Sequence, residues 1–188
     1  MNDLTMDAPA GCGYDLDVDL KLIAVDDAWS AFAIGNGTPE LPPPPPLGRS
    51  VLGAISDPTT AQVYRDLYQR VRSTGRPVTF PIRCDSPRLR RYLDISITPR
   101  PAGFRMRSTV RRTEPNPGGA VLQGGSSHTW PMLRVCSWCK KVDMDGGWEE
   151  LEVAVPKLYL LEAGPLPTLT HGICEECLER MEAVVECA

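Results

Sequence analysis

The chain has 188 residues, 42% of them hydrophobic, which is enough to bury the core of one medium domain with a small addition. No apolar run is long enough to span a bilayer, and the first residues lack the basic start and apolar stretch of a secretory signal. We therefore expect a cytoplasmic protein without a membrane partner. Paired cysteines in that compartment are typically metal ligands or redox groups rather than structural disulfides.

Charge is unevenly distributed along the chain. Residues 1–48 carry one lysine and eight acidic residues, whereas residues 49–135 carry fifteen arginines and five acidic residues. Residues 136–188 are acidic again, with four basic and eleven acidic residues. The basic middle could attract an acidic partner, or it could pair with the acidic flanks of its own chain. A nucleic-acid binder is not favoured, because the net charge is −4 and such proteins usually present a clearly basic domain.

The N-terminal part predicts a tail, a strand and a long helix. Residues 1–13 are expected to be disordered, and residues 20–25 (LKLIAV) are predicted to form a strand. Asp57 followed by proline is a strong helix start, and Gly75 marks the end of a helix over residues 58–74. One face of that helix is expected to point inward, because its apolar residues recur at four-residue spacing: Val63, Leu67 and Val71.

Three further strands are predicted over residues 78–83, 91–98 and 104–112. In the second of them apolar and polar residues alternate, with Leu93, Ile95 and Ile97 on one face. This period of two indicates an antiparallel sheet with one buried and one solvated face. Arg105, Arg107 and Arg111 fall on the solvated face.

A linker is predicted at residues 113–131, which are rich in Pro, Gly and Ser. Beyond it the composition changes and cysteine appears in pairs. The expected organisation is therefore a tail at 1–13, a first domain at 14–112, the linker, and a four-cysteine module at 132–188. The expected fold class is α+β.

The first domain resembles a PAS domain, the small sensor fold of bacterial signalling proteins. The resemblance lies in IAVDDAWSAF (23–32), LGRSVLGAI (47–55) and DISITP (94–99), although Asp26 stands where PAS domains often carry Asn. It implies an antiparallel sheet with flanking helices around a pocket. No segment matches the flavin-binding type, and both histidines, His128 and His171, lie outside this domain. No cofactor is therefore expected in the PAS-like pocket.

The strongest chemical signal is the cysteine pattern C-x2-C-x34-C-x2-C formed by Cys136, Cys139, Cys174 and Cys177. Two residues between cysteines let both sulfurs reach one metal from a tight knuckle, and a second pair completes a tetrahedron of four thiolates. Zinc prefers this geometry, although iron can adopt it. We expect a structural zinc ion that contributes to the folding of the module.

The module resembles a treble-clef zinc finger, in which a knuckle and a hairpin precede a helix bearing the second pair. CSWCKKV, Trp148 and THGICEECL also resemble a C-terminal module attached to PAS or receiver domains in bacterial signalling proteins. Lys140 and Leu178 stand where many zinc knuckles carry Gly. His171, Trp138 and Trp148 are expected to pack around the metal site or to hydrogen bond to its ligands rather than to bind the ion.

A second candidate site is the turn that carries Arg83, Arg88, Arg90 and Arg91. Four arginines around Asp85-Ser86-Pro87 could grip a phosphate or an acidic partner, or could form a solvated rim. A binding role would suit a protein that contacts another signalling protein, or a second copy of itself through the outer face of the sheet.

The combined patterns predict a bacterial signal-sensing regulatory protein that acts through protein–protein interaction. An enzyme is not expected, because no Ser/His/Asp set, Gly-rich phosphate loop or HExxH motif is present. Two alternatives remain open: a thiol redox switch that uses the CxxC pairs, and a nucleic-acid-binding regulator supported only by the arginine-rich middle.

Overall fold

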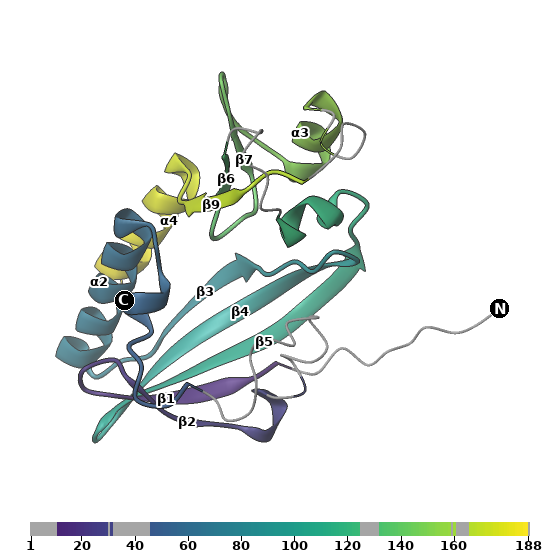
Figure 1. Ribbon diagram of the computed structural model, residues 1–188. Helices are drawn as coiled ribbons and strands as arrows, with labels where there is room; N and C mark the ends of the chain where they lie inside the picture. The colour runs from purple at the N-terminus through teal and green to yellow at the C-terminus, as the bar shows by residue number, and fades with distance from the viewer. Residues whose placement is uncertain are drawn as a thin grey trace.

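The computed structural model describes residues 11–29, 31, 46–124, 132–158, 160 and 166–187. Within these residues the chain forms two β-sheets, one of five strands and one of four, with helices packed against both (Figure 1). This arrangement confirms the predicted α+β class. None of the described helices combines the length and apolar composition that crossing a bilayer requires.

The larger sheet is antiparallel throughout, in the order β2-β1-β5-β4-β3. Its longest strands, β4 and β5, form a hairpin in which Arg100 pairs with Gly103 and Leu89 with Pro115. Both hairpin strands run past the predicted boundaries. The strands are β1 (Gly13–Asp17), β2 (Leu22–Val25), β3 (Val78–Arg83), β4 (Leu89–Arg100) and β5 (Gly103–Pro115).

Alternation along β4 places one face of the sheet in the core, as the sequence predicts. Leu93, Ile95 and Ile97 are buried, whereas Asp94 and Ser96 between them remain half exposed. β-branched and aliphatic side chains suit this pleated, one-sided burial.

Helix α2 (Pro58–Thr74) has the bounds that its end signals predict. The Asp57 carboxylate accepts a hydrogen bond from the Thr60 amide at 2.7 Å, and Gly75 ends the helix with a positive φ of 66°. The inward-facing side chains expected from the spacing are buried: Val63, Leu67 and Val71.

The smaller sheet has the order β8-β7-β6-β9. β6 pairs with β9 in parallel, and β7 and β8 form the predicted hairpin. The predicted helix with the second cysteine pair is present, and a further short helix contains Pro156. The elements are β6 (Leu133–Cys136), β7 (Val142–Met144), β8 (Gly147–Glu149), α3 (Leu151–Lys157), β9 (Leu169–Gly172) and α4 (Glu175–Cys187).

Two segments differ from the sequence prediction. Residues 13–17, where the sequence predicts no strand, form β1, which pairs with β5 over the register Gly13↔Arg107 to Asp17↔Gly103. In the predicted linker, β5 continues to Pro115 and a 3-10 helix, η2 (Gly119–Gln123), buries Val121 completely. Both differences arise from partners distant in sequence. The rest of that linker, 125–131, lies outside the described residues, as do residues 1–10 of the tail.

The two sheets share one hydrophobic cluster. It contains Phe80, Ile95 and Ile97 from the larger sheet together with Trp138 and Met181 from the cysteine-bearing part. Helices α2 and α4 lie against each other at this junction (Figure 1). A second cluster, around Val121, Val135 and Leu151, lies between the smaller sheet and α3.

Candidate metal centre

The four predicted ligands come together in the structure. The Sγ atoms of Cys136, Cys139, Cys174 and Cys177 all lie within 4.8 Å of one another, and those of Cys139 and Cys174 are 3.7 Å apart. Three of the four cysteines are buried and Cys139 is half buried. Such a cluster can hold a metal ion.

The first pair is presented by the turn that follows β6. The Cys136 amide donates to the Lys141 carbonyl at 2.8 Å, and the Lys140 amide donates to the Cys136 carbonyl at 3.1 Å. Lys140 takes a positive φ of 64°, the left-handed conformation that glycine adopts most easily. Its Nζ donates to the Ser137 carbonyl at 2.8 Å, which ties the lysine to the turn.

The second pair lies where α4 begins. Cys174 immediately precedes the helix and Cys177 is in its first turn, and the Leu178 amide donates to the Cys174 carbonyl at 2.9 Å. The Cys174 amide also donates to Cys136 Sγ at 3.5 Å. Free amide groups and the dipole at a helix N-terminus favour negative charge, so this position stabilises thiolates.

Parallel pairing of β6 with β9 brings the two cysteine pairs together. Cys136 pairs with Gly172, and the Ser137 amide donates to the Gly172 carbonyl at 2.8 Å. A Cβ atom at Gly172 would lie 2.4 Å from Nε of Arg134. The glycine before the second pair therefore leaves room for this side chain.

The sulfur spacing fits a tetrahedral zinc ion. With Zn–S bonds of about 2.3 Å, the edges of a regular tetrahedron are roughly 3.8 Å long. The Cys139–Cys174 separation of 3.7 Å matches that length, and the 4.8 Å limit for the whole set requires only small side-chain adjustments. A set of four thiolates leaves no open position for substrate, which is typical of structural sites.

The proximity of the thiols also favours a divalent cation. Hydrogen bonds from the Cys139 and Cys177 thiols lower the pKa of Cys136, so one thiolate is stabilised within the cluster. The same contacts with Cys136 raise the pKa of Cys139 to about 12 and that of Cys177 well above its ordinary value. Four neighbouring thiols cannot all ionise without a counter-charge, and a metal dication supplies it.

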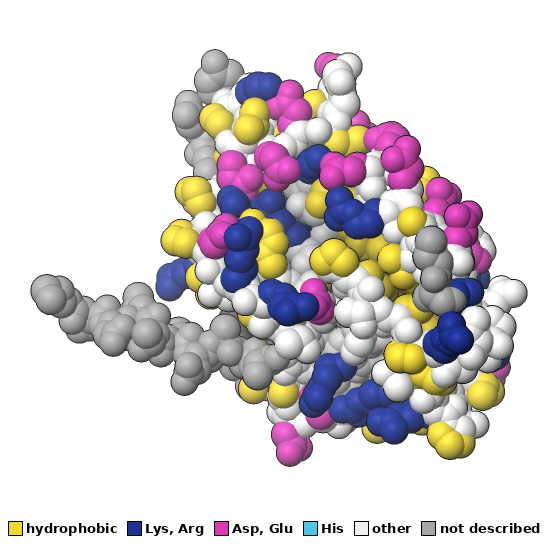
Figure 2. All heavy atoms as spheres, turned by 180° about the vertical axis from the view of Figure 1, so that it is seen from behind, with side chains coloured by type: hydrophobic (Ala, Val, Ile, Leu, Met, Phe, Trp, Pro, Cys, Tyr) yellow, Lys and Arg dark blue, Asp and Glu magenta, His cyan; other side chains and the backbone are white. Residues whose placement is uncertain are grey.

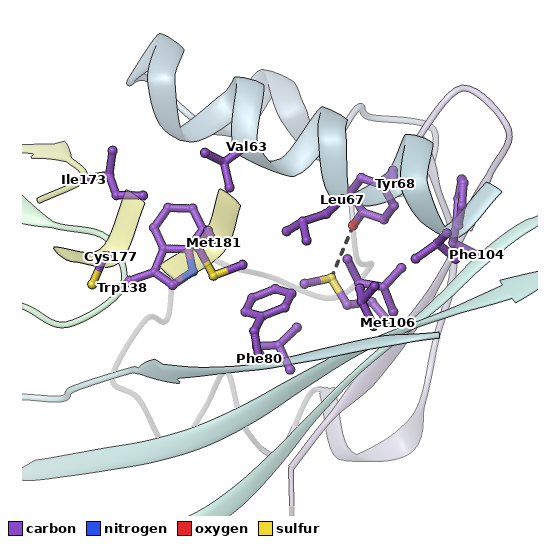
Figure 3. Packing of buried hydrophobic residues seen from close by; sticks show 14 of the residues in the cluster. Val63, Leu67, Tyr68, Phe80, Phe104, Met106, Trp138, Ile173, Cys177 and Met181 are labelled. Atoms are coloured by element: carbon purple, nitrogen blue, oxygen red, sulfur yellow. Dashed lines mark hydrogen bonds between the residues drawn. The ribbon is translucent and has the colours of Figure 1, made fainter. Parts of the chain in front are cut away.

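Trp138 connects the cysteine knuckle to the larger sheet. Its ring is 3% exposed and stacks on Tyr64 of α2, with centroids 5.3 Å apart and an interplanar angle of 28°. Its carbonyl accepts a hydrogen bond from the Arg83 amide at the end of β3, at 2.6 Å. Figure 3 shows the ring lying close to Met181 and Val63.

Trp148 and His171 are more exposed than Trp138. Trp148 is on β8, half buried, with the Arg134 guanidinium 5.3 Å from its ring centroid. His171 is exposed on β9, where it pairs with Val135, and does not belong to the sulfur cluster. Of the three residues expected to surround the site, Trp138 is the one buried against the core.

The arginine turn, for which the sequence left a binding role and a solvated rim open, is largely paired within the chain. Arg83 and Arg91 are each 5% exposed, so their guanidinium groups serve the interior of the protein rather than a partner. Arg83 binds Asp85 at 2.8 Å and Glu152 at 2.6 Å, and Arg90 also pairs with Glu152. Glu152 of α3 therefore neutralises this part of the turn and connects it to the cysteine-bearing part. Of the four arginines, only Arg88 is exposed.

The acidic N-terminal flank neutralises part of the outer sheet face in the same way. Arg105 pairs with Asp15 at 3.0 Å and with Asp26 at 3.2 Å. Figure 2 shows basic and acidic side chains interspersed over the back of the molecule. These contacts indicate that Arg83, Arg90 and Arg105 pair with acidic residues of their own chain rather than with a partner.

Sequence reasoning missed Glu152 and Tyr64 as partners of the site. Tyr64 was adjacent to the predicted inward face of α2, but nothing in its spacing identified the knuckle tryptophan as its neighbour. Nothing in the sequence around Glu152 predicts that it pairs with Arg83; it stands out only by its place in the first turn of α3. Comparison with known proteins gives no further assignment, because no family model and no curated protein matches this sequence.

Proposed function

We propose that this protein is a bacterial signal-sensing regulator in which a PAS-like domain is coupled to a structural zinc module of treble-clef type. The observation that carries the proposal is the cluster of four cysteine sulfurs within 4.8 Å of one another, built on a knuckle and on the start of a helix. Its closed ligand set supports a structural role for the metal and a non-enzymatic protein.

The arrangement around the cluster supports coupling between the two parts. A strand pair, a long helix and three antiparallel strands follow in the order that the PAS resemblance implies. Trp138 packs on Tyr64 of the long helix, and Arg83 at the end of β3 pairs with Glu152 of α3. A conformational change in the PAS-like domain would therefore be transmitted to the zinc module through these contacts. The output would be contact with another signalling protein in the cytoplasm.

The alternatives receive less support from the same geometry. A redox switch needs accessible thiolates, whereas Cys136, Cys174 and Cys177 are at most 1% exposed. A nucleic-acid-binding surface needs free basic groups, whereas Arg83, Arg90 and Arg105 pair with carboxylates.

Metal analysis of purified protein tests the proposal. We expect one zinc per chain and no visible absorption band, and we expect Cys139→Ser to lose the metal whereas Cys84→Ser retains it. A rubredoxin-like red colour would identify iron instead, and equal metal content in wild type and Cys139→Ser would refute the site. Capture of partners from native cytosol by wild type, compared with Cys139→Ser, tests the regulatory role.

A further inference from the structure

Helices α2 and α4 enclose a groove of about 300 Å³. Its floor is apolar: Val63 and Met181 are buried, and Leu178 and Val185 are half buried. The volume is at the lower end of the range for binding sites and suits a few side chains rather than a large ligand. The polar residues that line the groove are Thr59, Gln62, Asp66, Glu182 and Glu186.

The rim of this groove is negatively charged. Asp66 of α2 faces Glu182 and Glu186 of α4 across it, and no lysine or arginine is among the described lining residues. Arg65 does not line the groove; its guanidinium donates to Gln62 Oε1 at 3.1 Å. Acidic side chains gather along the edge of the molecule where α4 lies (Figure 2).

We propose that this groove docks a basic amphipathic segment of a partner protein. The proposal rests on the regulatory function proposed above and adds the chemistry of the partner. Apolar side chains at helical spacing would pack on Leu178 and Val185, which are partly exposed above the buried Val63 and Met181. Lysine or arginine on the flanks of the segment would meet the carboxylates of Asp66, Glu182 and Glu186. The same carboxylates repel nucleic acid and anionic membrane surfaces.

The geometry also makes docking depend on the metal. One wall of the groove belongs to α4, and that helix begins at the ligands Cys174 and Cys177. Met181 of the floor packs in the same cluster as Trp138 and Val63 (Figure 3). Loss of the metal frees the start of α4, so the two walls no longer hold a fixed spacing.

Fluorescence anisotropy with a labelled peptide tests the site. The probe is an amphipathic helix of about 18 residues with leucines on one face and lysines on the other, and a scrambled peptide of the same composition serves as its control. We expect saturable binding of the amphipathic peptide by zinc-loaded protein, weakened about tenfold by Glu182→Lys/Glu186→Lys. The matched variant Asp145→Lys/Glu179→Lys makes the same charge change outside the groove and should bind like wild type.

Several outcomes would overturn the proposal. They are no saturable binding by zinc-loaded wild type, equal binding of the scrambled peptide, or equal weakening by the two double variants. A wild type that is dimeric and becomes monomeric on Val185→Arg would show that a second copy fills the groove instead. Zinc content, measured on the same samples, separates the two proposals: zinc-loaded protein that ignores the peptide refutes the groove alone, whereas protein without zinc refutes the metal centre.

Discussion

Truncation of Trp138 should destabilise the whole protein even though this side chain binds no metal. The ring is 3% exposed and stacks on Tyr64 between the knuckle and α2. Replacing a buried tryptophan with alanine costs about 3–5 kcal/mol, a large share of the roughly 5–15 kcal/mol that stabilises a typical domain. For a chain of this length, the expected fall in the melting temperature is about 6–20 °C.

Trp148→Ala provides the matched control. That ring is half buried on β8, packs at the edge of the shared cluster and has the Arg134 guanidinium over it, so its loss should cost less, about 1–2 kcal/mol. Urea unfolding followed by circular dichroism, with zinc content measured on the same samples, gives both quantities. Trp138→Phe should recover part of the loss, because a smaller ring still fills part of the space. Equal destabilisation by Trp138→Ala and Trp148→Ala would refute the argument that Trp138 joins the two parts of the protein.

Three further perturbations test the site and its surroundings. Cys139→Ser should abolish stoichiometric zinc binding and increase proteolysis after residue 132, whereas Cys84→Ser should change neither; wild-type zinc content in the first variant would contradict the ligand assignment. Arg83→Met should destabilise by about 3–5 kcal/mol because it leaves the buried Asp85 without its ion pair, whereas the exposed Arg88→Met should stay within about 0.5 kcal/mol in urea unfolding. Burial raises the pKa of Glu152, but hydrogen bonds and the charge of Arg83 outweigh it and lower the pKa below 4.5. The stability from this pairing is therefore complete above the unfolded-state pKa and is lost as the pH falls through the lower folded-state pKa. Glu152→Gln should flatten that acid limb of the stability–pH curve, and an unchanged limb would show that the pairing contributes nothing.

Local chemistry made a large part of this protein predictable from its sequence. Asp57 and Gly75 define the ends of α2 because a side-chain cap and a left-handed residue act within one turn of the helix. Alternation along β4 identifies its buried face, since side chains of a strand point in opposite directions in turn. The cysteine cluster was predictable because the two residues within each CxxC pair hold its sulfurs in one tight turn.

Only the tertiary structure decided which distant segments meet. β1 was missed because GYDLD has a weak strand signal and gains its hydrogen bonds from β5, close to ninety residues away in the sequence. The arginine turn was expected to be open, but Arg83 is neutralised by Glu152, whose position depends on how α3 packs. Tyr64 and Trp138 stack only once the cysteine-bearing part has docked on α2. Caps, periodicity and ligand spacing act over a few residues and can be recognised in one sequence, whereas long-range pairing depends on the whole packed chain.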